Sequence, residues 1–121
     1  MNVSKQPDHQ VVDLDRALTR VAGDEEMLRE LVEIFLKESP AWLSQVQASV
    51  GKQEADGLFR AAHDIKGSTE VFCAEPAARA AQQLEKMGRQ GDLDGADEAL
   101  GALKAELVWV RNALEEYLEK G

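Results

Sequence analysis

One short segment of this 121-residue chain combines residue types that could do chemistry: residues 59–70, FRAAHDIKGSTE. His63 is followed by Lys66 and Gly67, which lie one helical turn further along on the same face of a helix. An unperturbed imidazole has a pKa of about 6.5, so its neutral form is a competent nucleophile near neutral pH. A phosphoryl group on the ring would add about two negative charges, to which Lys66 could form a charge-assisted contact. The spacing therefore predicts a phosphoryl acceptor with a stabilising cation.

Helical periodicity predicts which side of the segment faces solvent. At about 100° per residue, the apolar side is formed by Ala61, Ile65, Ser68 and Phe72. The residues within about 60° of His63 are Phe59, Arg60, Lys66, Gly67 and Glu70. Gly67 costs about 1 kcal/mol relative to alanine inside a helix, and we interpret it as leaving space for a group on the ring and for an approaching molecule. Phe59 could be part of the core, but we favour an exposed ring, which would offer a docking surface to a partner.

A carboxylate on the next predicted helix along the chain could orient the imidazole. Glu85 could hold one ring nitrogen of His63 as N–H and leave Nε2 free to attack. Gln82 and Arg89 share the side of that helix with Glu85, and the small Ala78 and Ala81 would permit close approach. Because acids are numerous in this chain, a plain surface role for Glu85 stays open.

The elements that must position these residues are helices, because apolar residues recur at three- to four-residue steps and no segment alternates like a strand. Pro40 predicts a break or kink in the second helix, with Ser39 as a cap. Residues 88–91 are predicted as a turn, and Asp92 as the cap of the last helix. The predicted helices span about 13–21, 24–50, 55–72, 76–87 and 92–118. Short connections make neighbours antiparallel, so we expect an all-α fold, an up-down antiparallel four-helix bundle with a short extra N-terminal helix.

Composition excludes several classes of protein. The chain has 14 Lys+Arg, 23 Asp+Glu and a net charge of −9, which disfavours binding to nucleic acid or to an anionic membrane. It has no apolar run of about 20 residues, no apolar secretory leader and no glycine-rich phosphate loop. We therefore expect no membrane span and no kinase or nucleotide site. A single cysteine, Cys73, excludes an internal disulfide and a Cys-based zinc motif, and favours a cytoplasmic location.

The length favours one domain. Residues 1–10 are polar and predict a flexible N-terminal tail, and residues 11–121 predict the helical bundle. His9 lies in the predicted tail, and we expect no specific role for it. Met1 and the short tail favour a free-standing protein over a piece of a larger kinase.

Residues His63 to Thr69, HDIKGST, resemble the H-x-[LI]-K-G-[SA]-[SA] signature of histidine phosphotransfer (HPt) domains. The resemblance extends over about residues 13–118. It ties the motif to its helical frame, in which the matching residues are Gly23-Asp24, Phe35-Leu36, Ser39-Pro40, Ala62, Ala81, Leu84-Glu85, Arg89, Gly91 and Asp92.

The resemblance implies an intermediate in a two-component phosphorelay without kinase activity. It would take a phosphoryl group from an aspartate of one receiver domain, in a response regulator or a hybrid sensor histidine kinase, and pass it to another. It implies no cofactor of its own, since Mg²⁺ comes from the receiver, and we expect a monomer. His63 would be phosphorylated on Nε2, Lys66 would stabilise the phosphoryl group, Gly67 would keep access open and Glu85 would orient His63. We expect partner binding at Phe59, Arg60, Glu70, Gln82 and Arg89.

The chain departs from the family pattern at three positions. Cys73-Ala74 replaces the usual Gly-Ala, Thr69 replaces a Ser or Ala, and Asp64 places an acid beside the histidine. An alternative function is a phosphate-independent helical adaptor that binds a partner protein through the Phe59 face. A metal-binding bundle would need more ligands than one histidine and scattered acids.

Overall fold

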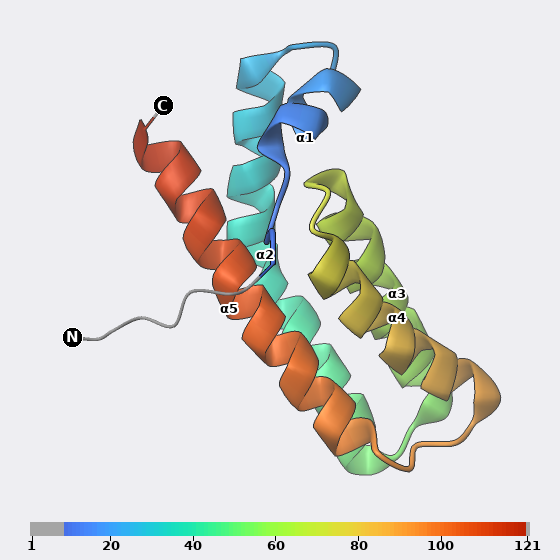
Figure 1. Ribbon diagram of the computed structural model, residues 1–121. Helices are drawn as coiled ribbons and strands as arrows, with labels where there is room; N and C mark the ends of the chain where they lie inside the picture. Colours follow the sequence, from blue (N-terminus) through green and yellow to red (C-terminus); the bar gives the residue numbers. More distant parts are fainter. Residues whose placement is uncertain (1–8, 121) are drawn as a thin grey trace.

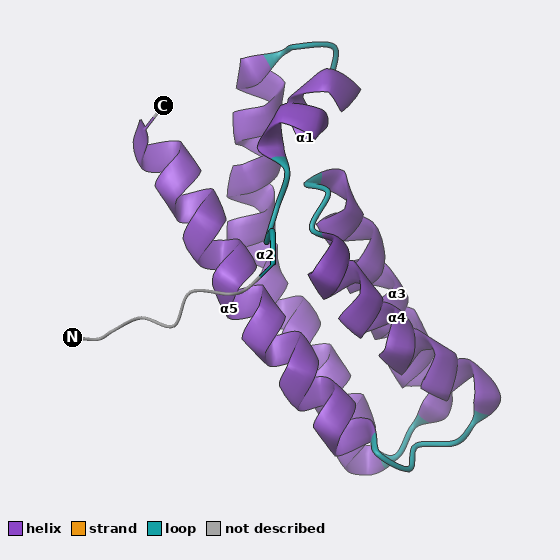
Figure 2. Ribbon diagram, viewed as in Figure 1, coloured by secondary structure: helices purple, strands orange, loops and turns teal. Residues whose placement is uncertain are grey.

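The computed structural model describes residues 9–120, and the described part is entirely helical (Figure 1, Figure 2). The helices are α1 (Leu14–Arg20), α2 (Glu25–Lys52), α3 (Ala55–Val71), α4 (Glu75–Gln90) and α5 (Ala96–Lys120). The all-α prediction is confirmed. Most of the predicted tail, residues 1–8, lies outside the described residues. None of the described helices is long and apolar enough to cross a membrane.

The four long helices form an up-down bundle (Figure 1). α3 and α4 share the most extensive contact, and α2 packs on α3, α4 on α5 and α5 on α2, which closes the ring of four. The short α1 packs against α2 at the end of the bundle where α2 begins (Figure 1). The predicted four-helix bundle with an extra N-terminal helix is therefore confirmed.

Each helix turns one apolar face inward, because the chain repeats its apolar residues with helical spacing. Phe35, Phe72 and Trp42 form edge-to-face pairs at the core, with the centroid of Phe35 5.6 Å from that of Phe72 and 5.7 Å from that of Trp42. On α3 the prediction is wrong by one position: Thr69 is fully buried, whereas Ser68 is only half-buried. Thr69 can be buried because its hydroxyl donates to the carbonyls of Ile65 and Lys66.

The predicted break at Pro40 is wrong, since α2 runs unbroken through it. A proline lacks the N–H that would bond the carbonyl four residues earlier, here that of Leu36. The guanidinium of Arg111 on α5 fills this gap: its Nη1 donates to Leu36 O at 3.0 Å and to Ser39 Oγ at 2.6 Å. A partner from another helix therefore satisfies the freed carbonyl, and α2 continues.

The predicted ends of α4 and α5 are also corrected. α4 extends to Gln90, so that Gly88 lies inside the helix, and Gly91 ends it in the left-handed conformation at φ 73°. Asp92 is not the cap of α5, because its Oδ1 accepts from the backbone N–H of Asp94 within the connecting turn. α5 begins only at Ala96.

His9 makes contacts that the sequence did not predict. Its Nε2 lies 3.1 Å from Oε1 of Glu106, and its ring meets Trp109 edge-on with centroids 5.4 Å apart. Both partners belong to α5, so the described chain is held against the bundle from its first residues.

Arg111→Met should destabilise the bundle by about 1–3 kcal/mol, because it leaves the part-buried Leu36 carbonyl and the hydroxyl of the buried Ser39 without their donor. Urea unfolding measures the change. Lys104→Met, which removes an exposed cation from the same helix, is the control and should have little effect. In a Pro40→Ala background the backbone N–H returns to Leu36, so the cost of Arg111→Met should shrink. An equal cost in both backgrounds would contradict this account of Pro40.

Candidate functional site

His63 stands on the outer side of α3, as its helical position predicts. Its side chain is 59% exposed, while Ala61 and Ile65, on the opposite side of the helix, are buried. Gly67 is exposed one turn along, and a Cβ atom placed there would meet nothing within 4 Å. The imidazole therefore borders open space on its C-terminal side.

Glu85 of α4 is a buried carboxylate that joins His63 to Lys66. Its Oε2 lies 2.5 Å from Nδ1 of His63, and its Oε1 lies 2.9 Å from Nζ of Lys66. The side chain of Glu85 is only 3% exposed, and that of Lys66 is 21% exposed. Burying a carboxylate is costly unless it is paired and hydrogen-bonded, and here each oxygen has a donor.

This contact determines which nitrogen of His63 can react. An ionised carboxylate only accepts hydrogen bonds, so Nδ1 carries the proton. In the neutral ring the lone pair is then on Nε2, the nitrogen that does not contact Glu85. The arrangement is that of a nucleophile oriented by a second group.

The electrostatics of the site keep Glu85 ionised. Burial would raise the pKa of its carboxyl, but hydrogen bonds from Lys66 and His63, together with their charges, outweigh burial and lower the pKa below its ordinary value of 4.5. The negative charge that orients His63 is therefore present throughout the neutral pH range.

Phe59 is not the freely exposed ring that we expected. It is half-buried and stacks on His63, with ring centroids 6.0 Å apart and planes 19° from parallel. The guanidinium of Arg89 covers the ring at 5.4 Å from its centroid, and its Nη2 lies 4.0 Å from Oε2 of Glu85. Phe59 of α3 and Arg89 of α4 therefore pack together beside His63, and they offer less open apolar surface than an exposed ring would.

The other predicted binding residues lie further from the imidazole. Arg60 is exposed on the side of α3 that faces α2, where it lines a shallow hollow with Gln45 and Asp64. Gln82 of α4 lines a groove with Lys66, Lys86 and Arg89, and so adjoins the site.

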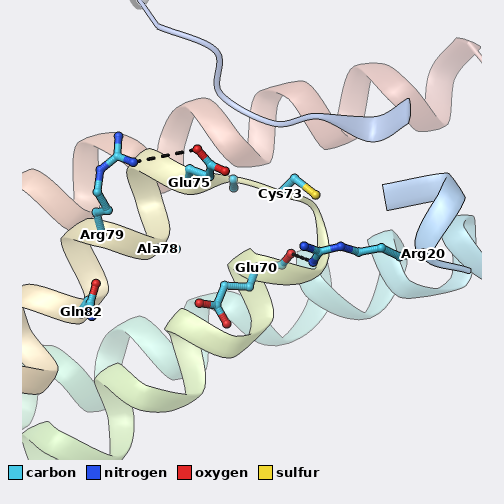
Figure 3. A pocket seen from close by; sticks show the side chains of 8 residues that line it. Arg20, Glu70, Cys73, Glu75, Ala78, Arg79 and Gln82 are labelled. Atoms are coloured by element: carbon cyan, nitrogen blue, oxygen red, sulfur yellow. Dashed lines mark hydrogen bonds and ion pairs between the residues drawn. The ribbon is translucent and has the colours of Figure 1, made fainter. Parts of the chain in front are cut away.

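Glu70 lies two turns beyond His63 and lines a different hollow from that of Arg60 (Figure 3). Its backbone carbonyl accepts from Arg20 of α1 at 2.8 Å. On the α4 side of this hollow Arg79 pairs with Glu75, as Figure 3 shows. Glu70 is therefore not among the residues that the structure gathers around the imidazole.

The departure at Cys73 is accommodated in the backbone. Cys73 adopts the left-handed conformation at φ 53°, which a glycine takes more readily. Its N–H donates to the carbonyl of Glu70, and the N–H of Ala74 donates to that of Thr69. The helix end that a glycine would form is therefore made with a buried cysteine, at a cost of about 1–2 kcal/mol for the left-handed conformation.

Gly88 is the site residue that the sequence reasoning missed, because its place among glycines predicted a turn. It continues the face of α4 that packs on α3. The buried residues of this face are Ala78, Ala81, Glu85 and Gly88. Their spacing of three and four residues was the signal that could have placed Gly88 inside the helix. Within residues 9–120, no group of three or more His, Cys, Asp or Glu side chains is arranged to hold a metal ion.

Comparison with known proteins identifies the fold and the family. Residues 30–118 match the family model of the Hpt domain. The sensor histidine kinase GacS of Pseudomonas protegens is 30% identical over 104 residues, which make up 80% of this chain but only 11% of GacS.

Two solved structures share the fold. Histidine-containing phosphotransfer protein B of Pseudomonas aeruginosa PAO1 superposes with a TM-score of 0.84 at 24% identity, covering 92% of this chain and 96% of its own. The HPT domain of a Shewanella sensor hybrid histidine kinase gives a TM-score of 0.78 at 20% identity, with the same coverage.

Glu85→Gln should change how stability depends on pH. Because the pKa of Glu85 is lowered in the folded protein, its carboxylate contributes stability that is complete above about pH 4.5 and is lost as the pH falls through the folded value. The variant should lose about 1.5–3 kcal/mol at neutral pH and depend less on pH in the acid range. Urea unfolding from about pH 3 to pH 7 measures this.

Glu98→Gln, which removes an exposed carboxylate of α5, controls for the loss of one charge. Equal acid sensitivity of wild type and Glu85→Gln would contradict the stabilising role of the carboxylate.

Proposed function

Because the chain belongs to the Hpt domain family, we propose that it works as a phosphorelay intermediate that carries its phosphoryl group on Nε2 of His63. The observation that carries the proposal is the exposed imidazole whose Nδ1 is held by the buried carboxylate of Glu85. Nε2 is thereby left as the nucleophile on the solvent side of α3.

The transfer needs a phosphodonor but no nucleotide. The lone pair of Nε2 attacks the phosphorus of an aspartyl phosphate on a receiver domain, the bond from phosphorus to the aspartate oxygen breaks, and the aspartate leaves as a carboxylate. The ring keeps its proton on Nδ1 and gains positive charge, which Glu85 balances at 2.5 Å. Attack by the aspartate of a second receiver on the same phosphorus reverses these steps and frees Nε2.

Lys66 and Gly67 support the same step from the next turn of α3. Lys66 is paired with Glu85 through one ammonium N–H, and an ammonium has three donors. It can therefore contact phosphoryl oxygens while it stays close to Glu85. Gly67 leaves the space next to the ring open, which suits the approach of a folded partner.

The partners we propose are receiver domains of response regulators and of a hybrid sensor histidine kinase. The name of one relative, GacS, describes a sensor histidine kinase, of which this chain spans only 11%. Mg²⁺ would belong to the receiver, and we propose a monomer that acts in the cytoplasm. The adaptor alternative is not favoured, because Phe59 is stacked on His63 and covered by Arg89.

Incubation with a phosphorylated receiver should label the wild-type protein through a bond that is labile in acid and stable in base. His63→Gln should abolish the label, because it removes the imidazole nitrogen that accepts the phosphoryl group. His9→Gln, which replaces the other of the chain's two histidines, is the matched control and should keep it. Label retained on His63→Gln, or lost only from His9→Gln, would contradict the assignment.

A further inference from the structure

Among the helical glycines of the described chain, Gly88 of α4 is the one at which an added Cβ atom would meet the backbone of another helix, α3. A Cβ atom at this position would lie 2.6 Å from the backbone nitrogen of Phe59, 2.7 Å from the carbonyl oxygen of Ala55 and 2.9 Å from the Cα of Phe59. All three atoms belong to the backbone of α3, which cannot rotate out of the way. A side chain at position 88 would therefore push the two helices apart.

This close approach lies one turn from the contact between Glu85 and His63. Gly88 follows Glu85 by three residues on α4, and Phe59 precedes His63 by four residues on α3. Because the two helices are antiparallel, the Gly88–Phe59 contact and the Glu85–His63 contact are neighbours along the same interface. Separation at the first contact would draw the Glu85 carboxylate away from the imidazole.

The hydrogen bond is sensitive to such a shift. Nδ1 and Oε2 are 2.5 Å apart, and N–H···O hydrogen bonds in proteins span heavy-atom distances of no more than about 3.2 Å. A shift of less than 1 Å would therefore weaken the hydrogen bond that keeps the proton of His63 on Nδ1. Other helical glycines lack this connection. A Cβ atom at Gly51, Gly67 or Gly101 would meet nothing within 4 Å, and one at Gly57 would meet only side-chain atoms, the nearest being Oγ of Ser49 on α2 at 2.8 Å.

We propose that Gly88 is a positioning residue for His63: the missing side chain lets α3 and α4 approach closely enough for Glu85 to fix the proton on Nδ1. The consequence for phosphoryl transfer rests on the proposed function, whereas the effect on the ring does not. Gly88 touches no reacting atom, so it acts only through the distance between the two helices.

The test variant is Gly88→Ala, made in a Gly101→Ala background. Gly101 is exposed and has open space around it, so alanine there should raise the stability of the fold. The ¹⁵N chemical shifts of His63 report its tautomer. We expect Nδ1–H to dominate in the wild type and in Gly101→Ala alone, and Nε2–H to increase in the variant. Labelling by a phosphorylated receiver should slow about tenfold or more. Glu85→Asp, which withdraws the carboxylate without altering the helix contact, should change both readouts in the same direction.

An unchanged tautomer in a folded Gly88→Ala variant would overturn the proposal. So would a variant that fails to fold in the strengthened background, because Gly88 would then be a requirement of the fold and not of the site. Additive effects of Gly88→Ala and Glu85→Asp would also overturn it, since two changes that act through one contact must couple. If the wild type is not labelled on His63, the proposed function fails, while the tautomer comparison still decides the role of Gly88.

Discussion

The buried carboxylate of Glu85 is the interaction on which the rest of the site depends. It lies almost entirely out of solvent between two donors from the other helix, Nδ1 of His63 and Nζ of Lys66. A carboxylate in that position is tolerated only because both oxygens are bonded. The same two bonds that make its burial possible also decide which nitrogen of His63 is free. The stability of the α3–α4 pair and the reactivity of the imidazole are therefore two consequences of one contact.

Helical periodicity and residue chemistry were enough to predict the bundle and the centre of the site. The exposed position of His63 and the open space at Gly67 follow from the positions of these residues relative to the apolar face of α3. The pairing of Glu85 with His63 was also predicted, because small residues on α4 made a close approach plausible. The positions of His63 and Gly67 depend only on neighbours within one helix, which a sequence displays directly.

Three of the predictions that were wrong concern residues whose partners come from other helices. Pro40 does not break α2, because Arg111 reaches the freed carbonyl from α5. Phe59 is not an open ring, because Arg89 lies over it. Gly88 looked like part of a turn, and only the packing of α4 on α3 shows that it belongs inside a helix. In each case the local rule is sound, but a tertiary contact outweighs it.

The position of the phosphoryl group is the most direct test of the account. Protein with ¹⁵N-labelled histidine, phosphorylated by a receiver, can be examined for coupling between ³¹P and each ring nitrogen. We expect a single coupling to Nε2 of His63, with the proton still on Nδ1 facing Glu85. Phosphorus bonded to Nδ1, to a nitrogen of His9 or to a carboxylate would contradict it.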